Sequence, residues 1–314
     1  MIRGPVDSMR AWGGQEVRDA ATVVTREPVR LARDGPLGRL PRGLAHVTAL
    51  RLDDLASRVL APNPSPMTLE GTNTYLLGAR GGGEVIVIDP GPDLPEHRAA
   101  IDRAIAELDA QVAAVVLTHH HADHAEAARW AGAWGATVYA WRPALIATAD
   151  ASPLRDGEVL ERAGVQIEAL HTPGHCRDHL CLRIVATGAV LTGDHVLGRG
   201  TTLVAWPDGD MADYLASLRR LGGLGARVLY PGHGPAINDP ARAVAALLAH
   251  RAEREEQILA ALAAGDRTPA QIVARVYADV DRALHPAAEQ SVRAHLDKLV
   301  AERRVARHEG TPRA

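Results

Sequence analysis

Residues 118–124 read Thr-His-His-His-Ala-Asp-His and directly follow an apolar run over residues 112–117. Imidazole nitrogens and carboxylate oxygens are the ligands that a zinc-type ion prefers. The apolar run predicts a buried strand, so the polar side chains start from a fixed point and a tight loop can turn them toward one another. A solvated His run or an expression tag is the alternative, but a tag lies at a terminus and has no interleaved Asp. The sequence therefore predicts a metal site at the end of this strand, with enough ligands for two neighbouring metals: His119, His121, Asp123 and His124.

Three later segments repeat the arrangement of an apolar run that ends on a potential metal ligand. The first passes through Thr-Pro-Gly to His175, the second ends on Asp194, and the third passes through Pro-Gly to His233. Each segment is weak evidence alone, because a single His after a strand is usually structural. Ligands placed just after strand ends, with Gly allowing close backbone approach, are how a sheet edge builds a site. The number and order of these segments predict that they join the same centre.

With Asp89 added at the start, this series resembles the metallo-beta-lactamase superfamily over about residues 60–240. All five motifs of that family occur in order. The resemblance implies an α/β fold of the αββα sandwich type and a centre of two divalent metals. It implies that the first metal is held by His119, His121 and His175, that the second is held by Asp123, His124 and His233, and that Asp194 bridges them. Asp89 would lie behind the ligands and fix their loops by hydrogen bonds.

The chemistry that such a centre supports is hydrolysis. Two divalent ions about 3.5–4 Å apart lower the pKa of a shared water enough to supply hydroxide near neutral pH. Asp123 could bind metal and also orient that water or relay its proton, so we expect it to be catalytic. Zinc is the expected metal, and manganese or iron would also fit His and Asp ligands. We therefore expect a metal-dependent hydrolase that acts at a carbonyl or phosphoryl centre.

The ligand pattern also narrows the branch of the superfamily. In antibiotic-degrading members a Cys or Ser usually stands where this chain has Asp194, so the chain is more similar to the glyoxalase II, lactonase and ribonuclease branches. Residues 63–77, 193–202 and 230–235 resemble the lactamase-beta-2-like group. Members of that group carry a C-terminal winged helix, and some cleave single-stranded RNA. His195 departs from the group, which more often has a small residue or Cys there, and we interpret this His as a chance substitution without a function.

The periodicity of apolar residues predicts a sandwich of two sheets flanked by helices. Strands are expected over 46–60, 72–78, 84–88, 112–117, 137–140, 165–170, 180–185, 189–192 and 227–230. Helices are expected over 96–108, 124–134, 211–221, 240–264, 268–277 and 287–303, with a short wing strand at 305–308. We predict three parts: an N-terminal extension (1–45), a catalytic domain (46–240) and a winged-helix-like region (241–314).

Composition is that of an ordinary globular protein, with 46% hydrophobic residues among 314. No apolar stretch approaches the roughly 20 residues needed to cross a bilayer, and the N-terminus lacks a secretion signal pattern. We expect a cytoplasmic protein with no membrane partner, in which Cys176 and Cys181 are buried or reduced thiols rather than a disulfide. Nothing in the sequence fixes the oligomeric state, and an oligomer is compatible with it.

The C-terminal charge pattern leaves the substrate open. Residues 291–314 hold six Lys or Arg and three Asp or Glu. A basic winged helix could grip phosphates, which would favour single-stranded RNA as the substrate. If the charges are only a solvated helix face, the region is a packing or dimerisation module, and the enzyme hydrolyses a small thioester, ester or lactone, as in glyoxalase II. A non-catalytic metal-binding scaffold is a third possibility, disfavoured because no ligand is missing.

Three side chains are weaker candidates for substrate contact: His179 in the cleft, and Arg177 and Arg199 for a phosphate or carboxylate.

Overall fold

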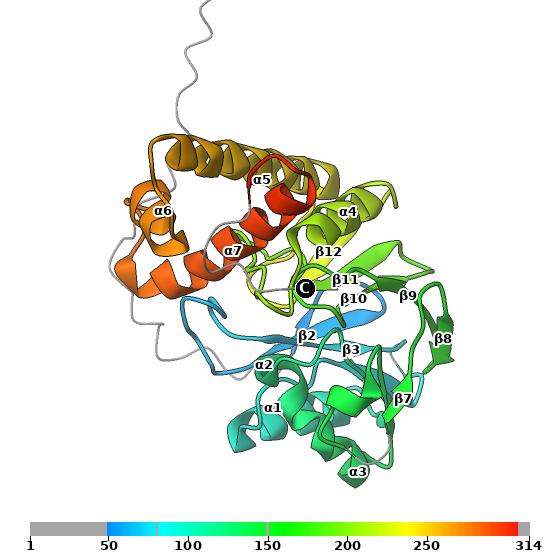
Figure 1. Ribbon diagram of the computed structural model, residues 1–314. Helices are drawn as coiled ribbons and strands as arrows, with labels where there is room; N and C mark the ends of the chain where they lie inside the picture. The colour runs from blue at the N-terminus through cyan, green and yellow to red at the C-terminus, as the bar shows by residue number, and fades with distance from the viewer. Residues whose placement is uncertain (1–48, 80, 149–150, 307–314) are drawn as a thin grey trace, which may run out of the picture. The chain divides into compact units, whose positions relative to one another are not determined.

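The computed structural model describes residues 49–306 except 80 and 149–150. The N-terminal extension predicted over 1–45 lies outside the described residues. The described chain forms part of one compact unit, in which two β-sheets face each other (Figure 1). Among the described residues, none of the helices combines the length and apolar character needed to cross a membrane.

The first sheet has seven strands in chain order, antiparallel from β1 to β4 and parallel from β4 to β7. Its central strands are almost entirely buried, which is why they read as apolar runs rather than alternating patterns. The strands are β1 (Leu50–Arg51), β2 (Ala56–Leu60), β3 (Asn73–Leu77), β4 (Glu84–Ile88), β5 (Gln111–Val116), β6 (Thr137–Ala140) and β7 (Ala151–Pro153).

The second sheet has five strands in the order β12-β11-β10-β9-β8. Only the β11–β12 pair is parallel, since the chain crosses over through a helix between those two strands. The strands are β8 (Val159–Arg162), β9 (Val165–His171), β10 (Leu180–Ile184), β11 (Ala189–Gly193) and β12 (Val228–Pro231).

Helices cover the outer face of each sheet. The apolar side chains between the sheets form one core, including Ile86 and Val116 from the first sheet and Ile167 and Leu182 from the second. Helix α1 (Pro95–Glu107) and the short α2 (Ala122–Ala125), η1 (Glu126–Trp130) and α3 (Ala131–Trp134) pack on the first sheet. Helix α4 (Met211–Gly222) packs on the second sheet, on the opposite side of the molecule (Figure 1). The predicted αββα sandwich is therefore confirmed.

Two predicted elements are divided in the structure. The strand expected over 46–60 is a hairpin, since the Asp53 carboxylate accepts hydrogen bonds from the amides of Leu55 and Ala56 at 2.8 Å and turns the chain there. The helix expected over 124–134 is split into α2, η1 and α3. The amide of Ala127 donates to the carbonyl of Gly91 at 3.1 Å, so it leaves the helical pattern. Strands β7 and β8 escaped prediction because they have only three and four residues and show no regular alternation of buried and exposed side chains.

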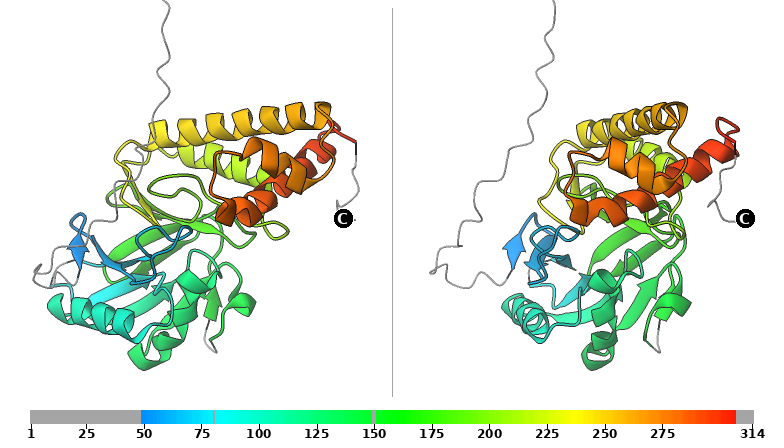
Figure 2. Two further views of the ribbon diagram at one scale, coloured as in Figure 1. Left: turned by 90° about the vertical axis from the view of Figure 1, so that its left-hand side faces the viewer. Right: turned by 60° about the vertical axis from the view of Figure 1, so that its left-hand side comes forward.

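The C-terminal region is helical. Helix α5 (Pro240–Ala263) is followed by α6 (Pro269–Val276), a single 3-10 turn η3 (Arg282–Leu284) and α7 (His285–Ala301). One more 3-10 turn, η2 (Pro143–Leu145), lies in the catalytic region, between β6 and β7. The long α5 spans two cores (Figure 2), with Val244 and Leu247 against α4 and Ile258 and Ala261 against α6 and α7. The wing strand predicted at 305–308 is not seen at 305–306, and residues 307–308 lie outside the described part of the chain.

His295 on α7 provides a prediction about acid stability. Its side chain is fully buried, and neither ring nitrogen has a hydrogen-bond partner among the described residues. Burial lowers the pKa of His295 to about 3, and the nearby Arg251 and Lys298 charges add to this. An unfolded chain therefore takes up a proton on this residue first, and the free energy of unfolding falls as the pH drops from about 6.5 toward 3.

Replacing His295 by leucine removes this proton uptake and a buried polar ring. We expect the His295→Leu variant to lose less stability than the parent between pH 7 and pH 4, by about 1–3 kcal/mol. Urea unfolding at each pH, with a chelator present throughout, measures the difference. An equal loss in the two proteins would show that His295 does not contribute.

Candidate metal centre

The ligand candidates gather where strands from both sheets end. His119 and His121 follow β5, and Asp123 and His124 lie on α2 directly after them. The other three come from the second sheet: His175 follows β9, Asp194 follows β11 and His233 follows β12. The structure therefore brings all seven predicted ligands to one edge of the sandwich.

The first group contains three imidazoles whose ring nitrogens converge. The Nδ1 atom of His121 lies 3.1 Å from Nε2 of His119 and 2.9 Å from Nε2 of His175. The three ligand atoms lie within 4.8 Å of one another. Three nitrogens at these separations can share one cation, which is the arrangement of a three-His metal site.

The second group adjoins the first and includes carboxylates. Oδ2 of Asp123 lies 3.2 Å from Nε2 of His233, which is 3.2 Å from Nε2 of His124. Asp194 lies between the groups, with Oδ1 3.3 Å from both His124 and His233 and Oδ2 3.8 Å from His175. Oδ1 of Asp194 is buried and forms no hydrogen bond of normal geometry among the described residues, although both ring nitrogens face it. A buried carboxylate oxygen in this position fits a shared cation.

Hydrogen bonds behind the rings set which nitrogen faces the centre. Nδ1 of His175 donates to the Leu203 carbonyl at 2.6 Å, and Nδ1 of His233 donates to the Gly71 carbonyl at 3.2 Å. Nδ1 of His124 donates to Oδ2 of Asp89 at 2.9 Å. Each donation leaves the Nε2 lone pair directed inward, as a metal ligand requires.

Asp89 connects the ligand loops from a buried position. Its backbone adopts a left-handed φ of 48°, a conformation that Asp tolerates better than most residues. Oδ1 accepts the amide of Thr118 and Oδ2 accepts the Thr118 hydroxyl, each at 2.7 Å, and Oδ2 also accepts from His124. Asp89 thus fixes both the start of the His-rich segment and one of its rings, in the place that the sequence suggested.

The charge balance of the centre also fits cations. Burial lowers the pKa of His121 to about 4 and holds that of His119 well below its ordinary value, so these rings are neutral. Burial opposes charge on His124 and His233 as well, but the Asp194 carboxylate outweighs it and raises the pKa of His233 to about 9. Without an ion, protons on these two rings balance the acids. A divalent ion would replace these protons.

Two glycines make the close packing of the ligand loops possible. A Cβ on Gly174, before His175, would lie 2.3 Å from Cα of Tyr214 on α4. A Cβ on Gly232, before His233, would lie 2.6 Å from Cε1 of His124. These contacts are the close approach that the Pro-Gly pairs in the sequence indicated.

His179 is placed behind the centre rather than in an open cleft. Its side chain is fully buried, Nδ1 bonds the Thr172 hydroxyl at 3.0 Å, and Nε2 accepts the Asp194 amide at 3.1 Å. This geometry supports the backbone of Asp194 and leaves no surface for the substrate contact that the sequence suggested. His195 is also fully buried, 4.9 Å from the Tyr214 ring between centroids.

The structure adds a cluster of polar side chains that the sequence did not predict. Nδ1 of His120 lies 2.7 Å from Oδ1 of Asp178, and the Cys176 thiol donates to the same oxygen at 3.3 Å. Asp208 lies close enough for the four side chains to share a cation. Their proximity to the ligands His119 and His175 in the sequence was the available signal, but the partners are 58 residues apart for the His120–Asp178 pair.

The weaker substrate candidates have partners or remain at the surface. Arg199 forms an ion pair with Glu70 at 2.5 Å, and the Arg177 side chain is exposed. Cys176 and Cys181 are both free and buried, as expected for thiols.

Family models match both parts of the chain. Residues 67–233 match the metallo-beta-lactamase superfamily, and residues 268–312 match the beta-lactamase associated winged helix domain, which confirms the predicted winged helix. The matched range of the first model contains every ligand candidate.

Individual proteins agree with the family models. Beta-lactamase-like protein 2 homolog of Caenorhabditis elegans is 33% identical over 270 residues, covering 82% of this chain and 88% of that protein. The atrochrysone carboxyl ACP thioesterase of Aspergillus chevalieri is 34% identical over 269 residues, covering 82% of this chain and 84% of that protein. A metallo-beta-lactamase family protein from Thermus thermophilus has a similar structure, with a TM-score of 0.71 and 28% identity, covering 82% of this chain and 96% of that one. The chain therefore belongs to the metallo-beta-lactamase superfamily and is a metal-dependent hydrolase of that superfamily.

Proposed function

We propose that this protein hydrolyses thioesters with a centre of two zinc ions. The observation that carries the proposal is the combination of a His/Asp centre with relatives named as thioesterases. The Aspergillus chevalieri protein is named as an acyl-carrier-protein thioesterase, and a 36% identical relative from Emericella nidulans is named as a thioesterase. The substrate class is an acyl group on a thiol carrier, either a carrier protein or a small thiol. A cytoplasmic location belongs to the same proposal, since both thiols are reduced.

The ligands are divided as the family resemblance implies. His119, His121 and His175 would hold one ion, Asp123, His124 and His233 would hold the other, and Asp194 would be shared between them. When bound, the ions supply Lewis acids for the thioester carbonyl and lower the pKa of the attacking water. Zinc is preferred because five of the seven ligands are imidazoles, and manganese or iron remain alternatives that metal analysis distinguishes.

Asp123 is the residue that we assign to proton transfer. About 32% of its side chain is exposed, against 13% for that of Asp194, so Asp123 is the carboxylate that reaches the open side of the centre. Its Oδ2 atom can accept a proton from the attacking water and pass it to the thiolate that leaves. Asp194, enclosed between the rings, serves as a ligand.

Single-stranded RNA is the less favoured substrate. Within residues 291–306, which the structure describes, three of the four Lys and Arg side chains that could bind phosphates are paired with acids. Lys298 bonds Glu255 at 2.7 Å and Glu302 at 2.9 Å, Arg293 bonds Glu289 at 2.7 Å, and Arg304 contacts Glu255 and Glu256. These pairs reduce the positive charge that the described part of this region offers to phosphates.

Turnover of two substrates distinguishes a thioesterase from a ribonuclease. The metal-loaded chain is assayed with an acyl thioester of glutathione, by release of free thiol, and with a labelled single-stranded RNA. His121→Ala, which removes a ligand, serves as the control for contaminating activity. Thioester hydrolysis that is lost in the variant is the expected result. RNA cleavage that is lost in the variant, without thioester hydrolysis, would overturn the proposal.

A further inference from the structure

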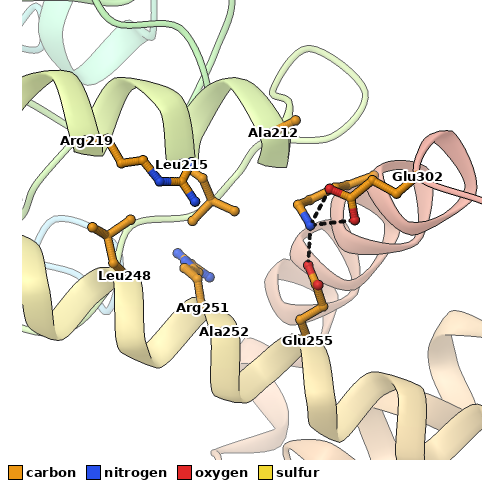
Figure 3. A pocket seen from close by; sticks show the side chains of 9 residues that line it. Ala212, Leu215, Arg219, Leu248, Arg251, Ala252, Glu255 and Glu302 are labelled. Carbon is orange, nitrogen blue, oxygen red and sulfur yellow. Dashed lines mark hydrogen bonds and ion pairs between the residues drawn. The ribbon is translucent and has the colours of Figure 1, made fainter. Parts of the chain in front are cut away.

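A cavity of about 320 Å³ lies where α4 meets α5 and α7. None of the metal ligands lines it, so it is separate from the centre. One wall is apolar and the rest carries charges, as Figure 3 shows. The lining includes Leu215 and Arg219 of α4, Leu248, Arg251 and Glu255 of α5, and Lys298 of α7.

The charges at one end of this cavity balance one another. Nζ of Lys298 donates to Glu255 at 2.7 Å and to Glu302 at 2.9 Å, and Arg304 also contacts Glu255. Two acids and two bases in mutual contact leave little attraction for a further ion. A charged ligand would therefore be held at the other end.

The other end contains two guanidinium groups without an acid partner. Arg251 is 2% exposed, its Nη2 donates to the Thr202 carbonyl at 2.5 Å, and its Nε has no hydrogen-bond acceptor in the described part of the chain. Neither Arg251 nor Arg219 has a described carboxylate within 4.0 Å. In Figure 3 both side chains point into the same space from α5 and α4. A buried cation without a counter-charge is costly, and an anion placed here would offset that cost.

We propose that the Arg219–Arg251 end of this cavity binds the oxyanion group of a small ligand, either a phosphate or a carboxylate. The planar donor fork of arginine matches both groups in two-point contacts. Leu215 and Leu248 form the apolar wall, which shields the ion pairs from water and accommodates a short hydrocarbon part of the ligand.

Arg251 also connects this cavity to the metal centre. The Thr202 carbonyl that it holds belongs to the segment that orients His175, because the next residue, Leu203, accepts the Nδ1 proton of that ring at 2.6 Å. The Thr202 hydroxyl lies 3.3 Å from the same nitrogen. An anion bound at Arg251 would therefore be linked to the metal ligand His175 through Thr202, which contacts both side chains.

Calorimetric titration of the full metal-loaded chain tests the site. Inorganic phosphate and hexanoate are titrated separately at constant ionic strength, to distinguish a phosphate ligand from a carboxylate ligand. We expect at least one of them to bind and Arg219→Gln to weaken that binding about tenfold or more, since one charge-assisted contact is lost. Arg219 is exposed, so this variant is expected to fold.

Arg242→Gln is the matched control, because it removes the same charge from an exposed position on α5 that does not line the cavity. It should bind the anion as the parent does. Phosphate bound at the metal centre would be retained in Arg219→Gln, so the comparison separates the two sites. Binding of neither anion, or equal weakening in the two variants, would overturn the proposal. Because no substrate enters this test, its failure would leave the proposed thioesterase function standing.

Discussion

Replacing Asp194 by alanine is expected to lower kcat/KM of the metal-loaded enzyme on a thioester by about a thousandfold, or ~4 kcal/mol of transition-state stabilisation. The side chain lies 3.3 Å from both His124 and His233 and 3.8 Å from His175, so no other carboxylate can take its place between the two groups. Loss of this carboxylate would remove the shared ligand and one of the two negative charges in the ligand set, Asp123 carrying the other. Steady-state kinetics and metal analysis by mass spectrometry on the same sample measure the two effects.

Asp279→Ala provides the matched control for this variant. Asp279 is exposed in the C-terminal region and has no hydrogen bond or ion pair within the described chain. It should keep the activity and metal content of the parent. An Asp194→Ala protein that still binds two ions and retains more than about a tenth of the parent activity would show that the bridge is not required.

Replacing Asp89 by asparagine is expected to weaken metal binding by about 10- to 100-fold. Asparagine has nearly the same shape, but its amide would face the Thr118 hydroxyl or the Nδ1 proton of His124 with a donor where an acceptor is needed. The ring of His124 would lose its orientation, and the loop that begins at Thr118 would lose one of its two anchors. Competition with a chelating dye measures the affinity for zinc.

Asp93→Asn is the control for this change. Asp93 lies in the same loop as Asp89 but bonds the indole of Trp130 at 2.9 Å and contacts Arg129, away from the ligands. Its zinc affinity should equal that of the parent. If Asp89→Asn also binds zinc as the parent does, the hydrogen bonds behind His124 do not contribute to the metal site.

The sequence was most informative where the chemistry is local. His119, His121, Asp123 and His124 start from one strand end, and strand ends at one edge of a sandwich must lie near one another, so their convergence follows from the pattern of runs and ligands. The Pro-Gly pairs at the other loops indicated close backbone approach, and Gly174 and Gly232 have it.

What the sequence could not predict depends on contacts between distant residues. The break in the helix expected over 124–134 depends on the Ala127–Gly91 hydrogen bond. The burial of His179 depends on Thr172 and the Asp194 amide, which directly follow strands β9 and β11. The ion pairs of the C-terminal Lys and Arg side chains could not be predicted either, because Lys298 and Glu255 are 43 residues apart and meet only when α5 packs on α7. No local pattern contains this information.

Thioester turnover as a function of added zinc tests directly whether this protein is a two-zinc thioesterase. The full chain is first freed of metal with a chelator, and zinc is then added in known equivalents while bound metal and rate are followed together. We expect the rate to rise as zinc binds and to reach its maximum when two ions are bound per chain. Full activity with one ion, or two bound ions with no thioester hydrolysis, would contradict this expectation.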